Sequence, residues 1–404
     1  MFISKPPIPS SPNIDHLDDE KQRLIKAMLA NNITEADLVN LRKMVDADDL
    51  AIIIQRIYDL NEKYILKISA VDGLLRKLDD IKNIRRNKRF TNKIKDGFRN
   101  STHTKRKVIL AEGDSWFNYP IILTDIIDRI SMEDNFAVYS LASGGDWLLN
   151  MLTGRHYVEQ LSVLHPDVFL ISGGGNDLVG SSRLATMLDP SGNSTELGKN
   201  EWAQNLITKA NAIVDFDPAR FWDGIRHVSR DFFALLMFFH LQYYSLIEGI
   251  VKNALKPDDK FYPIQIITQG YDYGVPSYKN GLGSNPGLWF VPFIRSFLGH
   301  GHWLKTPMQI RGILNEDVQK NIIYAMIYLF NEMMIGIGRY FNSVRSGSVS
   351  HIDSRGTVGN GGWTDELHPK PVHFMKTAKV FIGCINRTIE PDYEHVYIVT
   401  KPVL

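Results

Sequence analysis

The sequence contains very little cysteine, with one residue, Cys384, in a chain of 404. One thiol excludes an intrachain disulfide framework and a cysteine-based zinc cluster. Net charge is also almost absent, since 46 Lys and Arg face 45 Asp and Glu, so composition gives no overall reason to expect nucleic-acid binding. No apolar run near the start is long enough for a signal peptide. No run approaches a membrane span of about 18 residues, so we expect a cytoplasmic chain without a transmembrane segment.

Apolar residues make up 44% of the chain, which is enough to build a buried core. The length suggests two domains or one large elaborated domain. Leu, Ile and Met recur at helical spacing over residues 15–89, without the alternation typical of strands. We therefore predict a helical N-terminal region over 1–104, made of a small all-α domain and a basic linker. A second domain is predicted over 105–404.

Segment 76–107 is strongly basic, with 13 Lys and Arg against three Asp. Its local charge of +10 leaves −9 for the rest of the chain. One interpretation is a patch for an acidic partner, which could be a protein, a membrane surface or a nucleic acid. The other is a solvated helix end and linker. The near-neutral net charge is therefore the sum of a basic segment, 76–107, and an acidic remainder of the chain.

Beyond residue 106 the pattern becomes that of an α/β protein. Short apolar runs that end at or near glycine alternate with helical patterns, and the runs cover residues 107–111, 136–141, 168–171, 264–268 and 349–352. Buried strands that alternate with helices indicate a parallel sheet covered on both faces. Ligands of such sheets bind beyond the carboxyl ends of the strands, which is where the glycine clusters fall.

Two insertions interrupt the alternation, at 181–258 and 274–312. The first contains an aromatic-rich stretch over 232–239, which is most simply a buried helix, with a wall for an acyl chain as the sharper alternative. The second mixes Gly, Pro and aromatic residues directly after a predicted strand. That position favours a lid or a specificity loop.

Side chains with catalytic chemistry follow three of the apolar runs. A Gly-Asp-Ser sequence ending at Ser115 comes directly after the first run, where a serine nucleophile is accessible beside the N-terminus of the next helix. Asp365 and His368 follow the last run, three residues apart, so the carboxylate can orient the imidazole as a base. Asn176, after the third run, could donate to the oxyanion of a tetrahedral intermediate.

Together these segments resemble the four blocks of the SGNH (GDSL-type) hydrolases, over about residues 107–383. The matching blocks are Gly113-Asp114-Ser115, Gly145, Gly174-Gly175-Asn176-Asp177 and Asp365-Glu366-Leu367-His368. Each block alone is weak, but the four in this order are specific. The second block departs from the common Asn-x-Gly-x-x-Gly, because this chain has Ser-Leu-Ala-Ser-Gly-Gly over 140–145. Gly144 is therefore a rival to Gly145.

The resemblance implies a three-layer α/β/α flavodoxin-like sheet of five parallel strands and serine esterase chemistry. Ser115 would attack an ester carbonyl, His368 would act as base and then as acid, and Asp365 would orient His368. The backbone N–H groups of Ser115 and Gly145 and the Asn176 amide would form the oxyanion hole. Water would release the acyl-enzyme, and neither a metal nor another cofactor is implied.

The substrate is left open by these blocks. Trp116, Phe117 and Trp147 flank the catalytic blocks and would either shape a substrate pocket or pack the edge of the sheet. The aromatic-rich insertions favour a small-molecule or lipid-like acyl ester, with a carbohydrate O-deacetylase as the second hypothesis. A hypothesis of another class makes the chain an effector hydrolase, whose basic helical N-terminal region binds a partner, membrane or nucleic acid.

Overall fold

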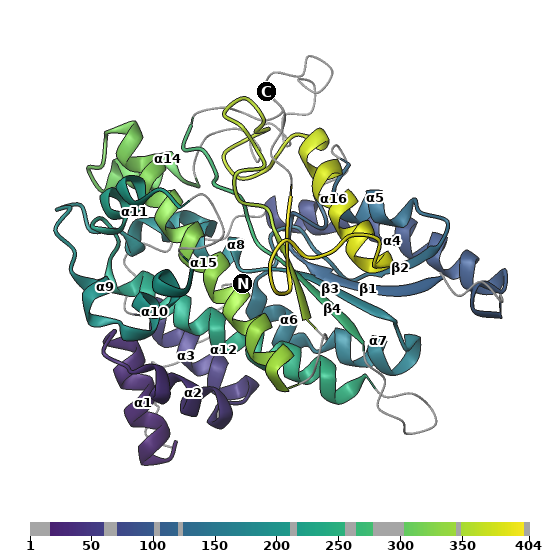
Figure 1. The fold of residues 1–404 in the computed structure, drawn as a ribbon, viewed down its shortest axis with the longest axis horizontal. Coiled ribbons are helices and arrows are strands. Elements are labelled where there is room, and N and C mark those ends of the chain that lie inside the picture. Colours follow the sequence, from purple (N-terminus) through teal and green to yellow (C-terminus); the bar gives the residue numbers. More distant parts are fainter. Residues whose placement is uncertain are drawn as a thin grey trace, which may run out of the picture.

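The computed structural model of the protein describes residues 17–59, 71–100, 106–119, 124–210, 216–254, 264–277, 303–344 and 349–399. Its centre is a parallel sheet with the strand order β2-β1-β3-β4-β5-β6 (Figure 1). The strands are β1 Lys107–Gly113, β2 Phe136–Ser140, β3 Val168–Ser172, β4 Gln265–Gln269, β5 Val349–Asp353 and β6 Val396–Ile398. The α/β class and the parallel sheet are confirmed.

The predicted count of five strands is wrong, because the described sheet has six. The additional strand, β6, has three residues and pairs in parallel with β5, from His351 opposite Val396 to Asp353 opposite Ile398. Such a short strand at a sheet edge is half-exposed, so it lacks the buried apolar run that identified the other five. The five predicted runs correspond to β1 to β5.

The order of the strands creates a crevice beside β1. The chain leaves β1 for β2 on one side and returns to β3 on the other, so both neighbours pair with β1 in parallel. At such a reversal the carboxyl ends of the strands open onto a shared crevice. Ser115 and Asn176 follow the two strands that flank this point.

Helices cover both faces of the sheet and the far side of the crevice. Helices α5 and α16 pack together on one side, and α6, α7 and α12 pack together on the other (Figure 1). The helices and 3-10 turns after β1 are α5 Ile126–Ser131, α6 Leu148–Gly154, α7 His156–Leu164, α8 Gly175–Val179, η4 Gly180–Met187, α9 Glu196–Lys199, α10 Glu201–Ala210, α11 Pro218–Ile225, α12 Arg230–Asn253, α14 Lys305–Ile310, α15 Glu316–Val344 and α16 Pro371–Asn386.

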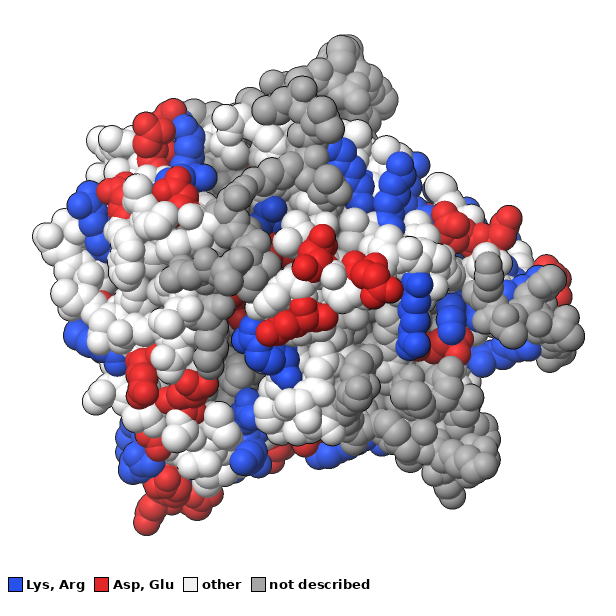
Figure 2. Space-filling view, in the orientation of Figure 1, with Lys and Arg blue, Asp and Glu red and all other residues white. Residues whose placement is uncertain are grey.

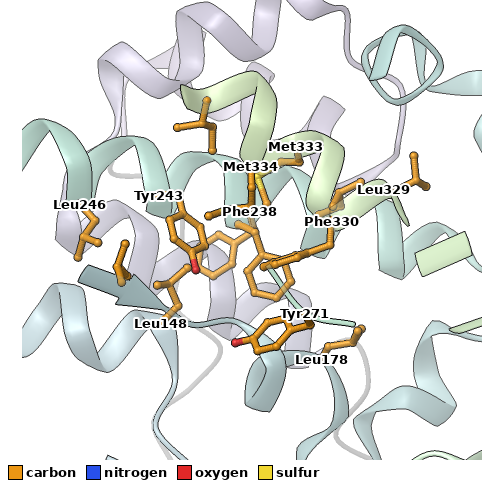
Figure 3. Close-up of a cluster of buried hydrophobic side chains, with 14 of the residues drawn as sticks. Leu148, Leu178, Phe238, Tyr243, Leu246, Tyr271, Leu329, Phe330, Met333 and Met334 are labelled. Atoms are coloured by element: carbon orange, nitrogen blue, oxygen red, sulfur yellow. The ribbon is translucent and has the colours of Figure 1, made fainter. Parts of the chain in front are cut away.

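The long helices α12 and α15 form much of the core outside the sheet. The aromatic stretch 232–239 lies in α12 and is buried throughout, as predicted for a core helix. Phe238 and Tyr243 of α12 meet Phe330 and Met334 of α15 in the cluster of Figure 3. By length and composition alone both helices could cross a membrane, but 83% of each apolar window is buried within the fold. That burial is typical of core helices.

The N-terminal helices share this core. Helices α1 Asp19–Leu29, α2 Glu35–Met44 and α3 Ala47–Asp59 contact α12, and their apolar side chains belong to the same buried cluster as the sheet. The Thr34 side chain accepts the backbone N–H of Asp37 and so caps the start of α2. The structure therefore does not set these helices apart as a clearly separate domain.

Helix α4, Val71–Lys95, followed by the turn η3 Phe98–Asn100, lies along the edge strand β2. The Asn87 side chain donates to the Ser140 carbonyl at 3.0 Å and accepts the Ser140 N–H at 2.9 Å. The Phe90 ring packs edge-on against Tyr139. An open edge strand exposes unpaired backbone groups. Helix α4 covers this edge, and the Asn87 amide forms the two hydrogen bonds that a neighbouring strand would otherwise form with Ser140.

Candidate active site

Three side chains distant in sequence form a hydrogen-bonded chain at the carboxyl edge of the sheet. The Oγ of Ser115, two residues after β1, lies 2.7 Å from Nε2 of His368. Nδ1 of the same imidazole lies 2.9 Å from both carboxylate oxygens of Asp365. A serine hydroxyl, an imidazole and a carboxylate therefore stand in the order that acyl transfer requires of a nucleophile, a base and an orienting acid. The structure brings together all three residues that the sequence singled out.

Asp365 is held as a carboxylate although it is only 2% exposed. Burial opposes its ionisation, but the neighbouring His368 and the hydrogen bonds to its oxygens outweigh that cost and hold the pKa of Asp365 below its ordinary value. The backbone N–H groups of Leu367 and His368 donate to one oxygen at 2.8 Å. The Tyr119 hydroxyl donates to the other at 3.2 Å. The carboxylate is thus fixed in place before any substrate arrives.

The predicted oxyanion donors lie on neighbouring loops of the crevice. Asn176 is the second residue of α8, lines the same cavity as Ser115 and His368, and donates to the Asp146 carbonyl at 3.1 Å. Gly145 directly precedes Asp146 and has a φ of +81°, a left-handed conformation that glycine adopts without strain. Gly144 has no positive φ. Backbone conformation therefore requires a glycine at 145 rather than at 144.

The turn that carries the nucleophile is fixed from behind by Asp114. Its Oδ1 accepts the Trp116 N–H at 3.0 Å, and its Oδ2 accepts the Tyr271 hydroxyl. The same hydroxyl accepts the Gly175 N–H at 3.1 Å, which links the loops after β1, β3 and β4. Burial raises the pKa of Asp114 to about 6. The sequence analysis missed Tyr271, although its place two residues after β4 puts it at the same sheet edge.

An apolar cavity of about 60 Å³ adjoins the catalytic residues. Ser115, His368 and Asn176 stand in its wall together with apolar side chains from α8, α15 and the loops. These apolar residues are Trp116, Leu178, Val179, Leu304, Ile323, Met326, Ile327, Phe330 and Leu367. A polar reacting group at the edge of an apolar cavity is the usual arrangement for holding an alkyl group while its ester is attacked.

The three aromatic residues considered for the substrate pocket have different positions. Trp116 lies in the cavity wall and packs edge-on against Tyr271 and Phe374. Phe117 is fully buried in the core, 5.8 Å from the ring of Phe381. Trp147 is half-buried, with the Arg183 guanidinium 4.0 Å above its ring. Among these three, Trp116 is the residue placed to contact a substrate in this cavity.

Potential metal ligands are scattered rather than clustered in the described part of the chain. Among these residues no three His, Cys, Asp or Glu side chains are arranged to hold a metal ion. His351 is buried and bonded at Nδ1 to the Thr268 hydroxyl. Most of the insertion 274–312, including the segment 278–302, lies outside the described residues, so its interpretation as a lid stays a prediction.

Part of the basic segment 76–107 forms ion pairs and hydrogen bonds within the molecule. Lys82 and Arg86 are buried against Asp125 and Asp128, and Lys93 donates to backbone carbonyls beside β2. On the face shown in Figure 2, basic and acidic side chains are interspersed. For these three residues the excess charge therefore serves to attach α4 to the rest of the fold.

No family model, curated protein or solved structure matches this chain. The resemblance to the SGNH hydrolases rests on the four sequence blocks. The hydrogen bond between Ser115 and His368 adds a geometric observation to these blocks, because it joins residues that are 253 positions apart in the chain.

Proposed function

We propose that the protein is a serine hydrolase of the SGNH type that cleaves carboxylic esters through an acyl-enzyme. The observation that supports it most is the chain from Ser115 Oγ to His368 to Asp365 in the wall of a cavity. The strand order β2-β1-β3-β4-β5 also agrees with the flavodoxin-like arrangement expected for this family.

The reaction would proceed in two matched halves. His368 takes the Ser115 proton as Oγ attacks the ester carbonyl, and the oxyanion is held by Asn176 and by backbone N–H groups, for which we propose Ser115 and Gly145. The intermediate collapses as His368 gives that proton to the departing alcohol, leaving the acyl group on Ser115. Water then attacks the acyl-enzyme by the same route and releases the acid.

The cavity supports an apolar acyl group as the part of the substrate nearest Ser115. Aliphatic and aromatic side chains dominate its wall, and burying an alkyl chain there gains roughly 25 cal/mol per Å² of apolar surface. An acetyl group would also enter, so a carbohydrate O-deacetylase is the second candidate. A series of p-nitrophenyl esters of rising chain length, run beside acetylated sugars, separates the two.

The assignment is tested by replacing the nucleophile. Ser115→Ala should lower kcat on p-nitrophenyl esters by at least about 10³-fold, because the covalent step is lost. A fluorophosphonate probe should label Ser115 in the wild-type protein. Ser162→Ala, on the exposed face of α7, is the matched control and should keep full turnover. Wild-type turnover in Ser115→Ala, or labelling at another residue, would contradict the assignment.

We do not extend the proposal to a partner-binding N-terminal module. The described basic side chains of α4 that are buried engage acids and carbonyls of the same chain. An acidic partner for 76–107 would have to use the remaining basic residues of the segment.

A further inference from the structure

Tyr119 contacts both the acid and the base of the catalytic chain. Its hydroxyl donates to Asp365 Oδ2 at 3.2 Å, and its ring stands edge-on to the imidazole of His368 with 4.5 Å between centroids. The residue is 1% exposed and is not among the residues that line the cavity beside Ser115. Tyr119 therefore touches the catalytic chain from behind, away from the described cavity.

The backbone of Tyr119 is fixed on both sides by charged groups. Its N–H donates to Asp125 Oδ2 at 3.1 Å, and its carbonyl accepts from Lys82 Nζ at 2.7 Å. Lys82 comes from α4, and Asp125 caps the start of α5. Two elements other than the strand that carries the nucleophile thus determine where the Tyr119 ring points.

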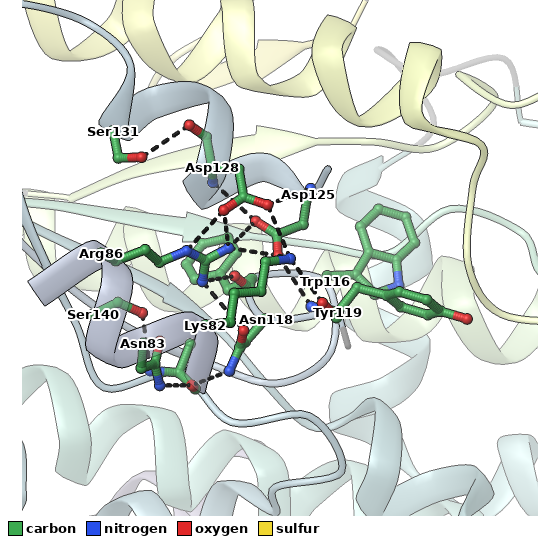
Figure 4. A network of polar contacts seen from close by, with 12 residues as sticks. Lys82, Asn83, Arg86, Trp116, Asn118, Tyr119, Asp125, Asp128, Ser131 and Ser140 are labelled. Atoms are coloured by element: carbon green, nitrogen blue, oxygen red, sulfur yellow. Dashed lines mark hydrogen bonds and ion pairs between the residues drawn. The ribbon is translucent and has the colours of Figure 1, made fainter. Parts of the chain in front are cut away.

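Arg86 holds the preceding residues of the same segment. It donates to the Phe117 carbonyl at 3.0 Å and pairs with Asp125 and Asp128 at 2.6 and 2.7 Å. Although burial opposes its charge, the two carboxylates raise the pKa of Arg86 above its ordinary value. Figure 4 shows the guanidinium and Lys82 converging on these two acids beside Tyr119. We call Lys82, Arg86, Asp125 and Asp128 the α4 cluster.

We propose that Tyr119 is a positioning residue of the catalytic triad and that the α4 cluster sets the position of its hydroxyl. The inference rests on the proposed hydrolase function. The hydroxyl donates to Oδ2 of Asp365, which also faces the imidazole, so it helps to hold the carboxylate in that orientation. The edge-on contact of the two rings limits rotation of His368. Such support for a catalytic group from behind lowers the reorganisation that the reaction requires. Helix α4 then belongs to the catalytic apparatus.

The first test removes a single oxygen. Tyr119→Phe should lower kcat about 10-fold, with KM nearly unchanged because the hydroxyl does not face the described cavity. Without the hydroxyl, the Asp365 carboxylate accepts one hydrogen bond fewer and attracts the proton between it and His368 more strongly. The acidic limb of the pH–rate profile should therefore move to higher pH. A purely structural role would not move that limb. Tyr139→Phe, in β2, is the matched control.

The second test alters the α4 cluster while keeping its charge. Arg86→Lys retains a cation but loses the guanidinium fork that reaches the Phe117 carbonyl and both aspartates. We expect a loss of kcat similar to that of Tyr119→Phe, and the double variant should lose little more, because both changes act on one contact. Arg85→Lys, at the exposed neighbouring position, should match the wild type. Thermal unfolding establishes that each variant is folded.

The outcomes separate the positioning role from the proposed function. If the wild type neither hydrolyses esters nor is labelled at Ser115, the hydrolase assignment falls. If it does both while Tyr119→Phe keeps the wild-type kcat, pH profile and rate of fluorophosphonate labelling, the positioning role is overturned. Losses of kcat that multiply in the double variant would show that α4 does not act through Tyr119. Should Arg86→Lys fail to fold, Tyr119→Phe still decides the role of the hydroxyl.

Discussion

Two clusters of charged side chains, one beside α4 and one at the end of β5, differ in what they connect. The α4 cluster joins a helix from the N-terminal region to the segment that follows the nucleophile. The other cluster, Arg355 with Asp353 and Glu332, lies where β5 ends. Arg355 pairs with Asp353 at 2.7 Å and with Glu332 of α15 at 2.8 Å, and its side chain is 0% exposed. We call these three residues the Arg355 cluster.

The difference lies in the path from each cluster to the catalytic residues. The α4 cluster bonds to the backbone of Tyr119, which itself bonds to Asp365. Arg355 stands ten residues before Asp365, and its ion pairs join β5 to α15 through Asp353 and Glu332. One cluster is therefore placed to affect catalysis, and the other to affect stability.

The largest expected effect comes from breaking the Arg355 cluster. Arg355→Met leaves two buried carboxylates without their cation and should lower the free energy of unfolding by about 3–5 kcal/mol. Urea denaturation measures this loss. The kcat per active site, counted by fluorophosphonate labelling, should stay close to that of the wild type. A large fall in kcat per labelled site would abolish the distinction between the two clusters.

The comparison is sharpened by Glu112, a buried carboxylate that forms no ion pair with any residue the structure describes. Burial and the charge of Asp146 raise the pKa of Glu112 from 4.5 to about 8. Between these values the unfolded chain loses the proton and the folded chain keeps it, so stability falls as pH rises from about 4.5 to 8. Glu112→Gln should raise the free energy of unfolding by roughly 3 kcal/mol at pH 7, because pH 7 lies about 2.5 units above the unfolded pKa and each unit corresponds to 1.36 kcal/mol.

Thermal melts across that pH range test the prediction for Glu112. The wild type and Glu112→Gln should melt at similar temperatures near pH 4.5 and separate steadily toward pH 8. Parallel curves for the two proteins would mean that Glu112 finds a compensating partner. In both clusters, by contrast, cations stabilise the buried carboxylates.

The smallest effect is expected where an ion pair faces water. Lys252 and Glu248 lie one turn apart on α12, 3.2 Å from each other, with both side chains exposed. Lys252→Ala should change the free energy of unfolding by less than about 0.5 kcal/mol, since solvent screens such pairs. Urea denaturation in low and high salt checks this value. A loss as large as that of Arg355→Met would show that burial is not what separates these ion pairs.

The fold could be predicted to the extent that the chain repeats one pattern. Short, mostly buried apolar runs with glycine at or near their ends identified β1 to β5. The strand β6 was missed because it has three residues, of which Val396 is buried and Tyr397 and Ile398 are half-buried, and so carries no such run. The packing of α1 to α3 against α12 was missed as well, since helical periodicity shows that a face is buried but not what covers it.

At the site, the residues with intrinsic chemistry could be predicted and their supports could not. Ser115, Asp365, His368 and Asn176 stand in short recognisable blocks at the ends of strands. Tyr119 and Tyr271 act through hydroxyl groups whose partners lie far away in sequence. In the sequence, Lys82 and Arg86 are as compatible with an exposed basic patch as with the buried ion pairs that they form. Contacts over such separations depend on the complete fold.

The pairing of Asn87 with Ser140 bears on where this chain could be divided. A polypeptide beginning at residue 105 would keep every catalytic block but would lose α4. The backbone groups of β2 that now bond to Asn87 and Lys93 would face solvent and offer a template to a strand of another molecule. Asp125 would be left buried without its cations. Such a fragment would tend to associate through the edge of its sheet. In the full chain, α4 covers that edge and so protects it from self-assembly.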